Sequence, residues 1–365
     1  MSLRCGIVGL PNVGKSTLFN SLSRSKAESA NYPFCTIDPN VGVIPIPDER
    51  LYKIAELVKP EKVIPTTIEF VDIAGLVKGA SKGEGLGNQF LANIRETDAI
   101  IHILRCFEDD NVAHIDGYVD PVRDKEVVDI ELQLKDIETV RNRMQKVEKQ
   151  AKSGDKEASK LMGILEKYEE FLVQGKPVRD LQLEGKEKDM VRDLHLLTDK
   201  PVLYVCNVDE VSALEGNRYV GQVKEAVSGE EAEVLVIAAS VEAEIAELET
   251  EEERQMFLEE LGLRMSGLDK LIHAAYRLLH LETFFTIGPK EVRAWTVKSG
   301  TPAPEAGGMI HSDFERGFIK AEVIKCSDFI GKGSEAACRE AGKIFLEGKD
   351  YIVKDGDIIT IKFNV

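Results

Sequence analysis

Residues 9–17 read Gly9-Leu10-Pro11-Asn12-Val13-Gly14-Lys15-Ser16-Thr17, which matches the pattern G-x-x-x-x-G-K-[ST]. An apolar run from Leu3 to Val8 precedes this stretch and is expected to form a buried strand, and Leu18 to Leu22 follows with the spacing of a helix. In this setting consecutive backbone N–H groups and the positive helix N-terminus can cradle a polyphosphate. The sequence therefore predicts an α/β P-loop nucleotide-binding core.

Two side chains of the loop have individual roles in this chemistry. Lys15 is expected to reach the β- and γ-phosphates and to act in catalysis, and the Ser16 hydroxyl is expected to hold Mg²⁺. A chance match in a glycine-rich turn is the alternative, but the correct flanking elements argue against it.

The composition indicates the class of protein. The chain has 365 residues and a net charge of −17, which allows two or three globular domains. No apolar run is long enough for a membrane span, and the N-terminus enters the first strand directly, so no targeting segment is expected. The six cysteines show neither a C-x-x-C pair nor zinc spacing, which suits a reducing compartment. A cytoplasmic protein is expected.

The charge is unevenly spread along the chain. Residues 225–262 carry thirteen Asp and Glu against one Arg, whereas residues 141–160 carry seven Lys and Arg against three Asp and Glu. The acidic total argues against general nucleic-acid affinity, yet the basic segment can still contact phosphate locally. A solvated helix face is the simpler interpretation of either run.

Further motifs fit the γ-phosphate side of a P-loop switch. Thr36 lies in a polar, proline-broken loop where a switch supplies a second hydroxyl to Mg²⁺. The strand Thr67 to Val71 runs into Asp72-Ile73-Ala74-Gly75, in which Asp72 is expected to hold Mg²⁺ and the Gly75 N–H to face the γ-phosphate. The next residue is Leu76, although related switches have a glutamine there that orients the attacking water. Hydrolysis is therefore expected to be slow, or another group positions the water.

One histidine is a candidate for that task. The strand Ile100 to Leu104 leads into a polar loop that contains His114, and ligands of open α/β sheets bind at this end of the strands. His114 is thus within conceivable reach of a water near the γ-phosphate, although spacing alone does not single it out.

The base-recognition segment departs from the guanine pattern. Guanine-specific P-loop proteins end the corresponding strand in N-K-x-D, whereas this chain has Asn207-Val208-Asp209-Glu210. Adenine presents an acceptor where guanine presents donors, so displacement of the carboxylate favours ATP over GTP. Asn207 and a main-chain carbonyl are then expected to serve the 6-amino group, and the segment ending at Ser240 forms a wall for the base.

Two further regions complete the predicted organisation. Residues 127–197 show apolar residues at intervals of three and four, broken at Gly154, which predicts an antiparallel coiled-coil hairpin inserted in the core. Residues 283–365 contain short strands and one helix, Ala336 to Phe345, which is typical of a β-grasp domain. The P-loop domain accordingly comprises residues 1–126 and 198–282.

With these motifs in view, the chain resembles the YchF, or Obg-like ATPase, family over its whole length. The resemblance rests on GLPNVGKST, NYPFCT, DIAGLVKGASKGEGLG, NVDE in place of N-K-x-D, and a final segment similar to a TGS domain. It implies a P-loop core with a coiled-coil insertion, preference for ATP, and association with the ribosome in translation or stress regulation.

Roles for individual residues follow from the resemblance by position. It implies that Asn12, Val13, Gly14, Lys15, Ser16 and Thr17 bind phosphates and that Ser16 and Thr36 hold Mg²⁺. Val208 would contact adenine through its backbone beside Asn207, and His114 would take part in hydrolysis. Asn12 also resembles the residue of potassium-dependent relatives, which makes K⁺ a second candidate cofactor.

The function expected from these features is a slow ATPase that works as a molecular switch. Its expected partner is the ribosome, contacted through the basic hairpin tip and the TGS-like domain. An Obg-type GTPase and a nucleotide-sensing binding module with negligible hydrolysis are the alternatives. A small-molecule kinase fits less well, since neither an acceptor pocket nor a catalytic acid is apparent.

Overall fold

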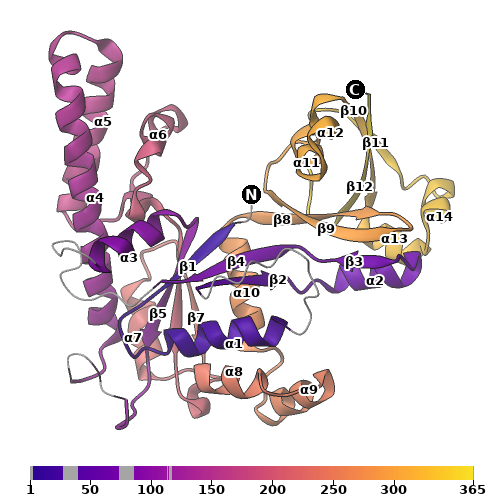
Figure 1. Ribbon diagram of the computed structural model, residues 1–365, viewed down its shortest axis with the longest axis horizontal. Coiled ribbons are helices and arrows are strands. Elements are labelled where there is room, and N and C mark those ends of the chain that lie inside the picture. Colours follow the sequence, from indigo (N-terminus) through magenta and orange to yellow (C-terminus); the bar gives the residue numbers. More distant parts are fainter. Residues whose placement is uncertain (1–2, 28–39, 74–85, 113, 115–116, 365) are drawn as a thin grey trace. The chain divides into compact units, whose positions relative to one another are not determined.

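The computed structural model describes residues 3–27, 40–73, 86–112, 114 and 117–364. The chain divides into two compact units, Met1–Ile44 with Glu69–Ala275 and Pro45–Ile68 with Tyr276–Val365. The first unit contains the predicted P-loop core. Figure 1 shows its central sheet with the strands labelled.

The sheet of the first unit has the strand order β2-β4-β1-β5-β6-β7. Its strands are β1 (Arg4–Val8), β2 (Val41–Pro45), β4 (Thr67–Asp72), β5 (Ala99–Arg105), β6 (Val202–Asn207) and β7 (Glu233–Ile237). The pairs β1–β4, β1–β5, β5–β6 and β6–β7 are parallel. All residues of β5 and β6 are buried, as expected for central strands of a parallel sheet covered on both faces.

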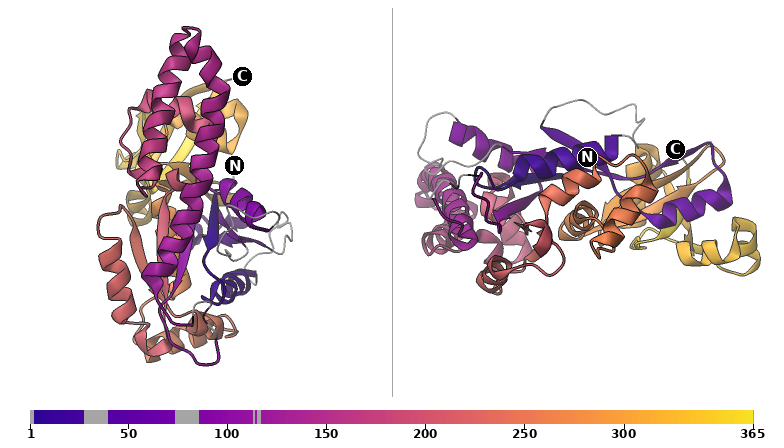
Figure 2. Two further views of the ribbon diagram at one scale, coloured as in Figure 1. Left: turned by 90° about the vertical axis from the view of Figure 1, so that its left-hand side faces the viewer. Right: turned by 90° about the horizontal axis from the view of Figure 1, so that it is seen from below.

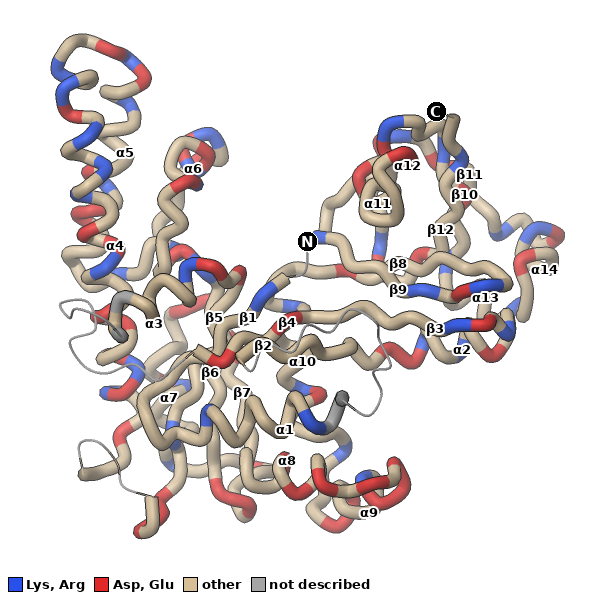
Figure 3. The backbone as a smooth tube through the Cα atoms, viewed as in Figure 1, with Lys and Arg blue, Asp and Glu red and all other residues tan. Residues whose placement is uncertain are grey.

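Helices of the first unit lie between these strands in the chain or follow β7. They are α1 (Lys15–Ala27), α3 (Leu86–Arg95), α7 (Arg218–Ala226), α8 (Ala239–Ile245), α9 (Glu251–Glu260) and α10 (Gly267–Leu278). Helix α1 packs against α8, and Figure 1 shows the two side by side. The acidic run lies on α8, α9 and the segments around them, and in Figure 3 much of the backbone tube around α9 has the red of Asp and Glu. Thr250 and Glu253 begin α9 with a capping box.

The predicted hairpin is present and projects from the sheet of its unit (Figure 1). It consists of α4 (Pro121–Lys152) and the shorter α5 (Lys156–Val173), which lies against the C-terminal part of α4 (Figure 2). Gly154 makes the turn with a φ of +89°, and the Asp155 side chain then caps α5 by accepting from the N–H groups of Glu157 and Ala158. The glycine break predicted from the sequence is thus the tip of the hairpin.

The hairpin differs from the expected one at both ends. Helix α4 already begins at Pro121, because Asp120 caps it and proline suits the first helical position. After α5 the chain forms short helices, namely η1 (Val178–Asp180), α6 (Gly185–Val191), η2 (Arg192–Leu194) and η3 (Leu197–Asp199). A further short helix, η4 (Glu210–Ser212), follows β6.

The second unit contains a six-stranded sheet of order β11-β10-β12-β8-β9-β3. Its strands are β3 (Lys62–Ile64), β8 (Leu281–Ile287), β9 (Glu291–Lys298), β10 (Phe318–Lys325), β11 (Phe345–Glu347) and β12 (Asp357–Phe363). Its helices are α2 (Glu49–Val58), α11 (Ala303–Ile310), α12 (Ser312–Arg316), α13 (Cys326–Lys332) and α14 (Glu335–Glu340). The prediction of one helix in residues 283–365 is therefore wrong, although the β-rich, TGS-like character of the domain is confirmed.

One segment belongs to a unit other than the one predicted for it. Residues 45–68, assigned above to the P-loop domain, group with the C-terminal residues. Leu51 and Ile54 of α2 are fully buried in a cluster with Phe285 and Val292, and β3 pairs in parallel with β9. Apolar burial and strand pairing therefore both hold this segment in the second unit.

Candidate nucleotide-binding site

The P-loop has the backbone geometry that its sequence predicts. Asn12 and Gly14 adopt φ values of +63° and +91°, and α1 begins directly afterwards at Lys15. The Leu18 N–H donates to the Gly14 carbonyl at 3.0 Å, which closes the first turn of the helix. A Cβ atom at Gly14 would lie 2.1 Å from Nδ2 of Asn207, so this position accepts only glycine without displacing its neighbour.

Lys15 and Asp72 form an ion pair at the end of the central strands. Lys15 Nζ lies 2.7 Å from Asp72 Oδ1, and the two side chains are 9% and 17% exposed. Asp72 is in register with Ile7, so the last residue of β4 lies beside the end of β1, just before the P-loop. The fold thus brings together the lysine and the carboxylate that sequence motifs 57 residues apart predict.

The residues predicted to hold Mg²⁺ are partly described. Ser16 is exposed in the first turn of α1, and Asp72 lies at the adjoining strand end. A hydroxyl and a carboxylate are oxygen ligands of the kind that Mg²⁺ prefers, and this ion usually takes its remaining ligands from water and phosphate. The described part of the chain contains no cluster of three or more His, Cys, Asp or Glu side chains that could hold a metal without such help. Thr36, Gly75 and Leu76 lie outside the described residues.

Asn207 ties two loops of the site together. Its Nδ2 donates to the Val13 carbonyl at 2.9 Å, and its Oδ1 accepts from the Ala239 N–H at 2.9 Å. The side chain is buried, so these bonds are shielded from water. Asn207 therefore fixes the P-loop to the turn after β7. In this arrangement both ends of its side-chain amide are bonded to the protein backbone, whereas the sequence pattern predicts that it contacts the 6-amino group of the base.

The remaining base-side residues lie where strands β6 and β7 end. Val208 is buried, and its N–H donates to the Ile237 carbonyl at 2.9 Å. Because the N–H is engaged in this way, the backbone group that Val208 can offer to a ligand is its carbonyl. The Asp209 side chain accepts from the Ser212 N–H and caps η4, whereas Glu210 is exposed. Ser240 is exposed at the start of α8. The position of the guanine-binding Asp of N-K-x-D is thus occupied here by a solvated glutamate.

His114 is paired with a residue that the sequence analysis did not select. Its Nε2 lies 2.9 Å from Oδ2 of Asp124, and the two side chains are only 6% and 1% exposed. Asp124 lies in the first turn of α4, ten residues further along the chain. Nothing in the sequence spacing marks this pair, because α4 was expected to begin after Asp124.

Arg105 is a second residue that sequence reasoning missed. It is a buried residue at the end of β5, and its guanidinium donates to the carbonyls of Phe107, Asp109 and Val112. One side chain therefore holds the start of the loop that leads to His114. An arginine at the end of an otherwise apolar strand is the signal that could have indicated this role.

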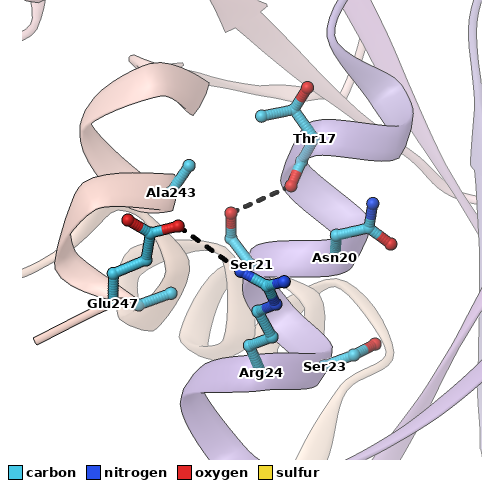
Figure 4. Close-up of a pocket in the computed structure, with 8 residues that line it drawn as sticks. Thr17, Asn20, Ser21, Ser23, Arg24, Ala243 and Glu247 are labelled. Carbon is cyan, nitrogen blue, oxygen red and sulfur yellow. Dashed lines mark hydrogen bonds and ion pairs between the residues drawn. The ribbon is translucent and has the colours of Figure 1, made fainter. Parts of the chain in front are cut away.

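A separate groove lies between α1 and α8. It has a volume of about 560 Å³ and is lined by Thr17, Ser21 and Arg24 on one side and by Ala243 and Glu247 on the other, as Figure 4 shows. Arg24 and Glu247 approach to 3.5 Å across it. Only Thr17 belongs to the predicted phosphate site, so the groove is beside that site rather than part of it.

Comparison with known proteins gives a family. A protein from Bacillus subtilis named "Ribosome-binding ATPase YchF" is 57% identical over 367 residues, which cover all of both chains. The chain belongs to the YchF family. A YchF protein of the same name from Escherichia coli O157:H7 is 54% identical over 365 residues, again covering both chains fully. The YchF GTPase of Schizosaccharomyces pombe has a solved structure that matches with a TM-score of 0.90 and 36% identity, over 99% of this chain and 98% of that one.

Family profiles match the two parts of this YchF chain separately. A profile described as "50S ribosome-binding GTPase" matches residues 4–157, and the YchF-GTPase C-terminal profile, described as "Protein of unknown function (DUF933)", matches residues 281–364. The YchF resemblance and fold class predicted from sequence are confirmed. The chain is a P-loop nucleoside triphosphatase, a class whose nucleotides are in general bound with Mg²⁺. None of its described helices is both long and apolar enough to cross a membrane.

Proposed function

We propose that the chain is a slow, Mg²⁺-dependent ATPase that binds the ribosome and acts as a switch in translation and the stress response. The proposal that the chain binds nucleotide rests on the geometry of the P-loop. Its Lys15 pairs with Asp72 at the end of β4, and its Val13 carbonyl accepts a hydrogen bond from Asn207 at the end of β6. The bacterial relatives described above are named ribosome-binding ATPases, which supports the same assignment.

ATP is the proposed substrate, with GTP bound more weakly. Guanine recognition needs a carboxylate aimed at N1–H and the 2-amino group, but at the position of the final Asp of N-K-x-D this chain has the longer, exposed Glu210. The Val208 carbonyl can accept from the 6-amino group of adenine, which guanine lacks. Ser240, at the start of α8, is proposed to form a wall for the base.

The phosphates and the cation have proposed partners in the same site. Asn12, Val13, Gly14, Lys15, Ser16, Thr17 and Gly75 would contact the phosphates. Ser16, Thr36 and Asp72 would hold Mg²⁺, which when bound neutralises phosphate charge. Asn12 is the residue through which K⁺ would act as a second cofactor. Asp72 would hold the cation in place of its ion pair with Lys15, which would leave Lys15 to contact the phosphates.

His114 is proposed to position the attacking water or to accept a proton from it. It would thus take over the task of the glutamine that related switches have at the position of Leu76. A water-positioning group contributes ~10²–10⁴-fold to the rate. Phosphate release from ATP should therefore fall about a hundredfold in His114→Ala while ATP binding is kept. Lys15→Ala should weaken ATP binding by about tenfold or more, because a charge-assisted hydrogen bond is lost. ATP binding and turnover equal to the parent in both variants would refute the nucleotide site.

Nucleotide choice can be tested by restoring the guanine pattern. The double variant Val208→Lys/Glu210→Asp recreates N-K-x-D and should raise the affinity for GTP relative to ATP, measured by competition at equal concentrations. An Obg-type GTPase would instead prefer GTP in the parent chain. A pure sensing module would bind nucleotide without releasing phosphate.

Ribosome binding is proposed to involve the hairpin tip and the TGS-like unit. Lys149 and Lys156 are exposed on either side of the Gly154 turn, and in Figure 3 basic and acidic positions alternate along the backbone at this end of the hairpin. Such cations can contact rRNA phosphates. Lys149→Glu/Lys156→Glu should weaken co-sedimentation with ribosomes, and the difference from the parent should be largest at low salt, because salt weakens the phosphate contacts that the variant lacks. Lys186→Glu/Lys224→Glu makes the same change of charge at exposed sites of the same unit and should leave binding intact.

A further inference from the structure

His114 is held at the base of the hairpin by a buried carboxylate. The Nε2–Oδ2 distance to Asp124 is 2.9 Å, and both side chains are nearly excluded from solvent. The loop that carries His114 leaves β5 at the same sheet edge as the P-loop, because β1 and β5 run parallel. The pair is therefore at the nucleotide end of the sheet.

Asp124 is itself fixed by the start of α4. Its N–H donates to the Asp120 carbonyl at 3.0 Å, and its second oxygen, Oδ1, accepts from Arg123 Nη2 at 3.1 Å. Asp120 caps the helix by accepting from the Arg123 N–H. The backbone and the other carboxylate oxygen thus both hold Asp124 in one orientation toward His114.

The next residue anchors this turn to the sheet. Lys125 Nζ lies 2.8 Å from Oε1 of Glu230, just before β7, and 2.7 Å from Oδ2 of Asp129. Glu230 also accepts from the hydroxyl of Tyr204 on β6 at 2.8 Å and pairs with Arg179 at 3.2 Å. A partly buried network of this kind gives the first turns of α4 a single position relative to the strands.

We propose that Asp124 is a positioning residue for ATP hydrolysis and that it acts through His114, an inference that rests on the function proposed above. A neutral imidazole that donates Nε2–H to a carboxylate has its acceptor lone pair on Nδ1. Asp124 therefore selects the tautomer in which Nδ1 carries the acceptor lone pair, and it fixes the orientation of the ring. The carboxylate also stabilises the positive charge that develops if the ring takes a proton.

The test is a double-mutant cycle on the full chain. Asp124→Asn keeps the shape but removes the charge and offers Nε2–H an amide that also donates. Loss of such an orienting partner typically lowers activity ~10–100-fold, so we expect kcat to fall by about that factor with KM and ATP affinity unchanged. In a His114→Ala background, Asp124→Asn should cause no further loss, because its effect passes through the missing ring.

A matched control lies on the same helix. Asp136 is fully buried on α4 and accepts from the N–H groups of Leu197 and Thr198, with no contact to His114. Asp136→Asn should lower the urea midpoint while the folded protein keeps its kcat. Asp124→Ser is a second variant that lacks the carboxylate. The double-mutant cycle is calculated from the kcat values of whichever Asp124 variant retains ATP binding.

The outcomes separate the two proposals. An unchanged or raised kcat in the Asp124 variant, or an equal loss with and without His114, overturns the role of Asp124 alone. Equal turnover of the parent and His114→Ala overturns the role of the histidine. Absence of phosphate release from the parent chain overturns the ATPase itself.

Discussion

At Gly14 the backbone has a φ of +91°, and the hydrogen in place of Cβ lets Asn207 Nδ2 approach the loop. Gly14→Ala should therefore strain the backbone by about 1–3 kcal/mol and push Asn207 away from the Val13 carbonyl. We expect a lower urea midpoint together with loss of ATP binding, measured by denaturation and by titration with ATP. Gly163→Ala is the matched control: this helical glycine has open space around its added Cβ, so alanine should stabilise the chain by up to ~1 kcal/mol.

His102 on β5 gives the stability a dependence on pH. Burial, together with the nearby charges of Lys125 and Arg179, lowers the pKa of His102 from 6.5 to about 3. Between these values the unfolded chain binds a proton that the folded chain does not. The free energy of unfolding should therefore fall as the pH drops from about 6.5 toward 3, by at most ~1.4 kcal/mol per pH unit from this group.

His102→Phe removes that titration and keeps a ring beside Tyr204, with which His102 has a centroid distance of 5.7 Å. The difference in unfolding free energy between variant and parent should shift in favour of the variant as the solution is acidified through this window. Urea titrations at pH 7, 6, 5 and 4 measure it. Parallel curves for the two proteins would contradict the prediction.

At the scale of single residues, the sequence predicted the place of a side chain in the fold where a motif follows directly on a recognisable strand. The P-loop, Asp72 and Asn207 could be located because each follows an apolar strand, and parallel strands end at a common edge. Asp124 and Arg105 could not, because their importance arises from contacts with a loop whose path the sequence does not encode locally. The role of each site residue toward nucleotide stays a prediction.

Helix α4 shows how an element is attached to the rest of its unit. Asp136 accepts from the N–H groups of Leu197 and Thr198 and from the Thr198 hydroxyl, and so ties η3 to the helix. Asp136→Ala leaves three buried donors without this acceptor, which should cost several kcal/mol, since each buried unsatisfied group costs about 1–3 kcal/mol. Hydrogen exchange should show faster exchange at the amides of 197 and 198. Unchanged protection there would show that the tie is dispensable.

The elements were predicted unevenly. Strong apolar periodicity and the Gly154 break gave the hairpin, but Ile130 and Leu134 are 52% and 38% exposed, whereas Val128 and Leu132 form the buried stripe near the base of α4. Each of these two pairs of apolar residues has a spacing of four, so the sequence offers two helix faces near the base of α4. Only tertiary packing decides which face is buried. The short helices α11 to α13 were missed because each has fewer than nine residues, too few for a helical period to stand out.

For the whole molecule, the largest departure from expectation is the place of residues 45–68. Leu51 is fully buried against residues of the C-terminal unit, although more than two hundred residues separate them in sequence. A local pattern identifies an amphipathic helix here, but not the sheet on which it packs. Contiguity along the chain therefore suggested the wrong unit.

Leu51→Ala should destabilise the second unit by about 2–5 kcal/mol. The single tryptophan, Trp295, lies on β9 and reports on this unit, so the urea midpoint of its fluorescence should fall. Leu57→Ala changes an exposed leucine of the same helix and should have little effect. An unaltered fluorescence transition in Leu51→Ala would contradict the assignment of α2 to this core.

The separation of α2 from its packing partners also has a consequence for synthesis. Roughly 230 residues of chain must be added after Leu51 before Phe285 exists. At typical elongation rates of about 5–20 residues per second, the apolar face of α2 waits on the order of ten to fifty seconds for the surface that will cover it. The C-terminal sheet is thus completed only after residues 281–363 have been synthesised, and a nascent chain stalled before β8 would expose a hydrophobic helix to chaperones.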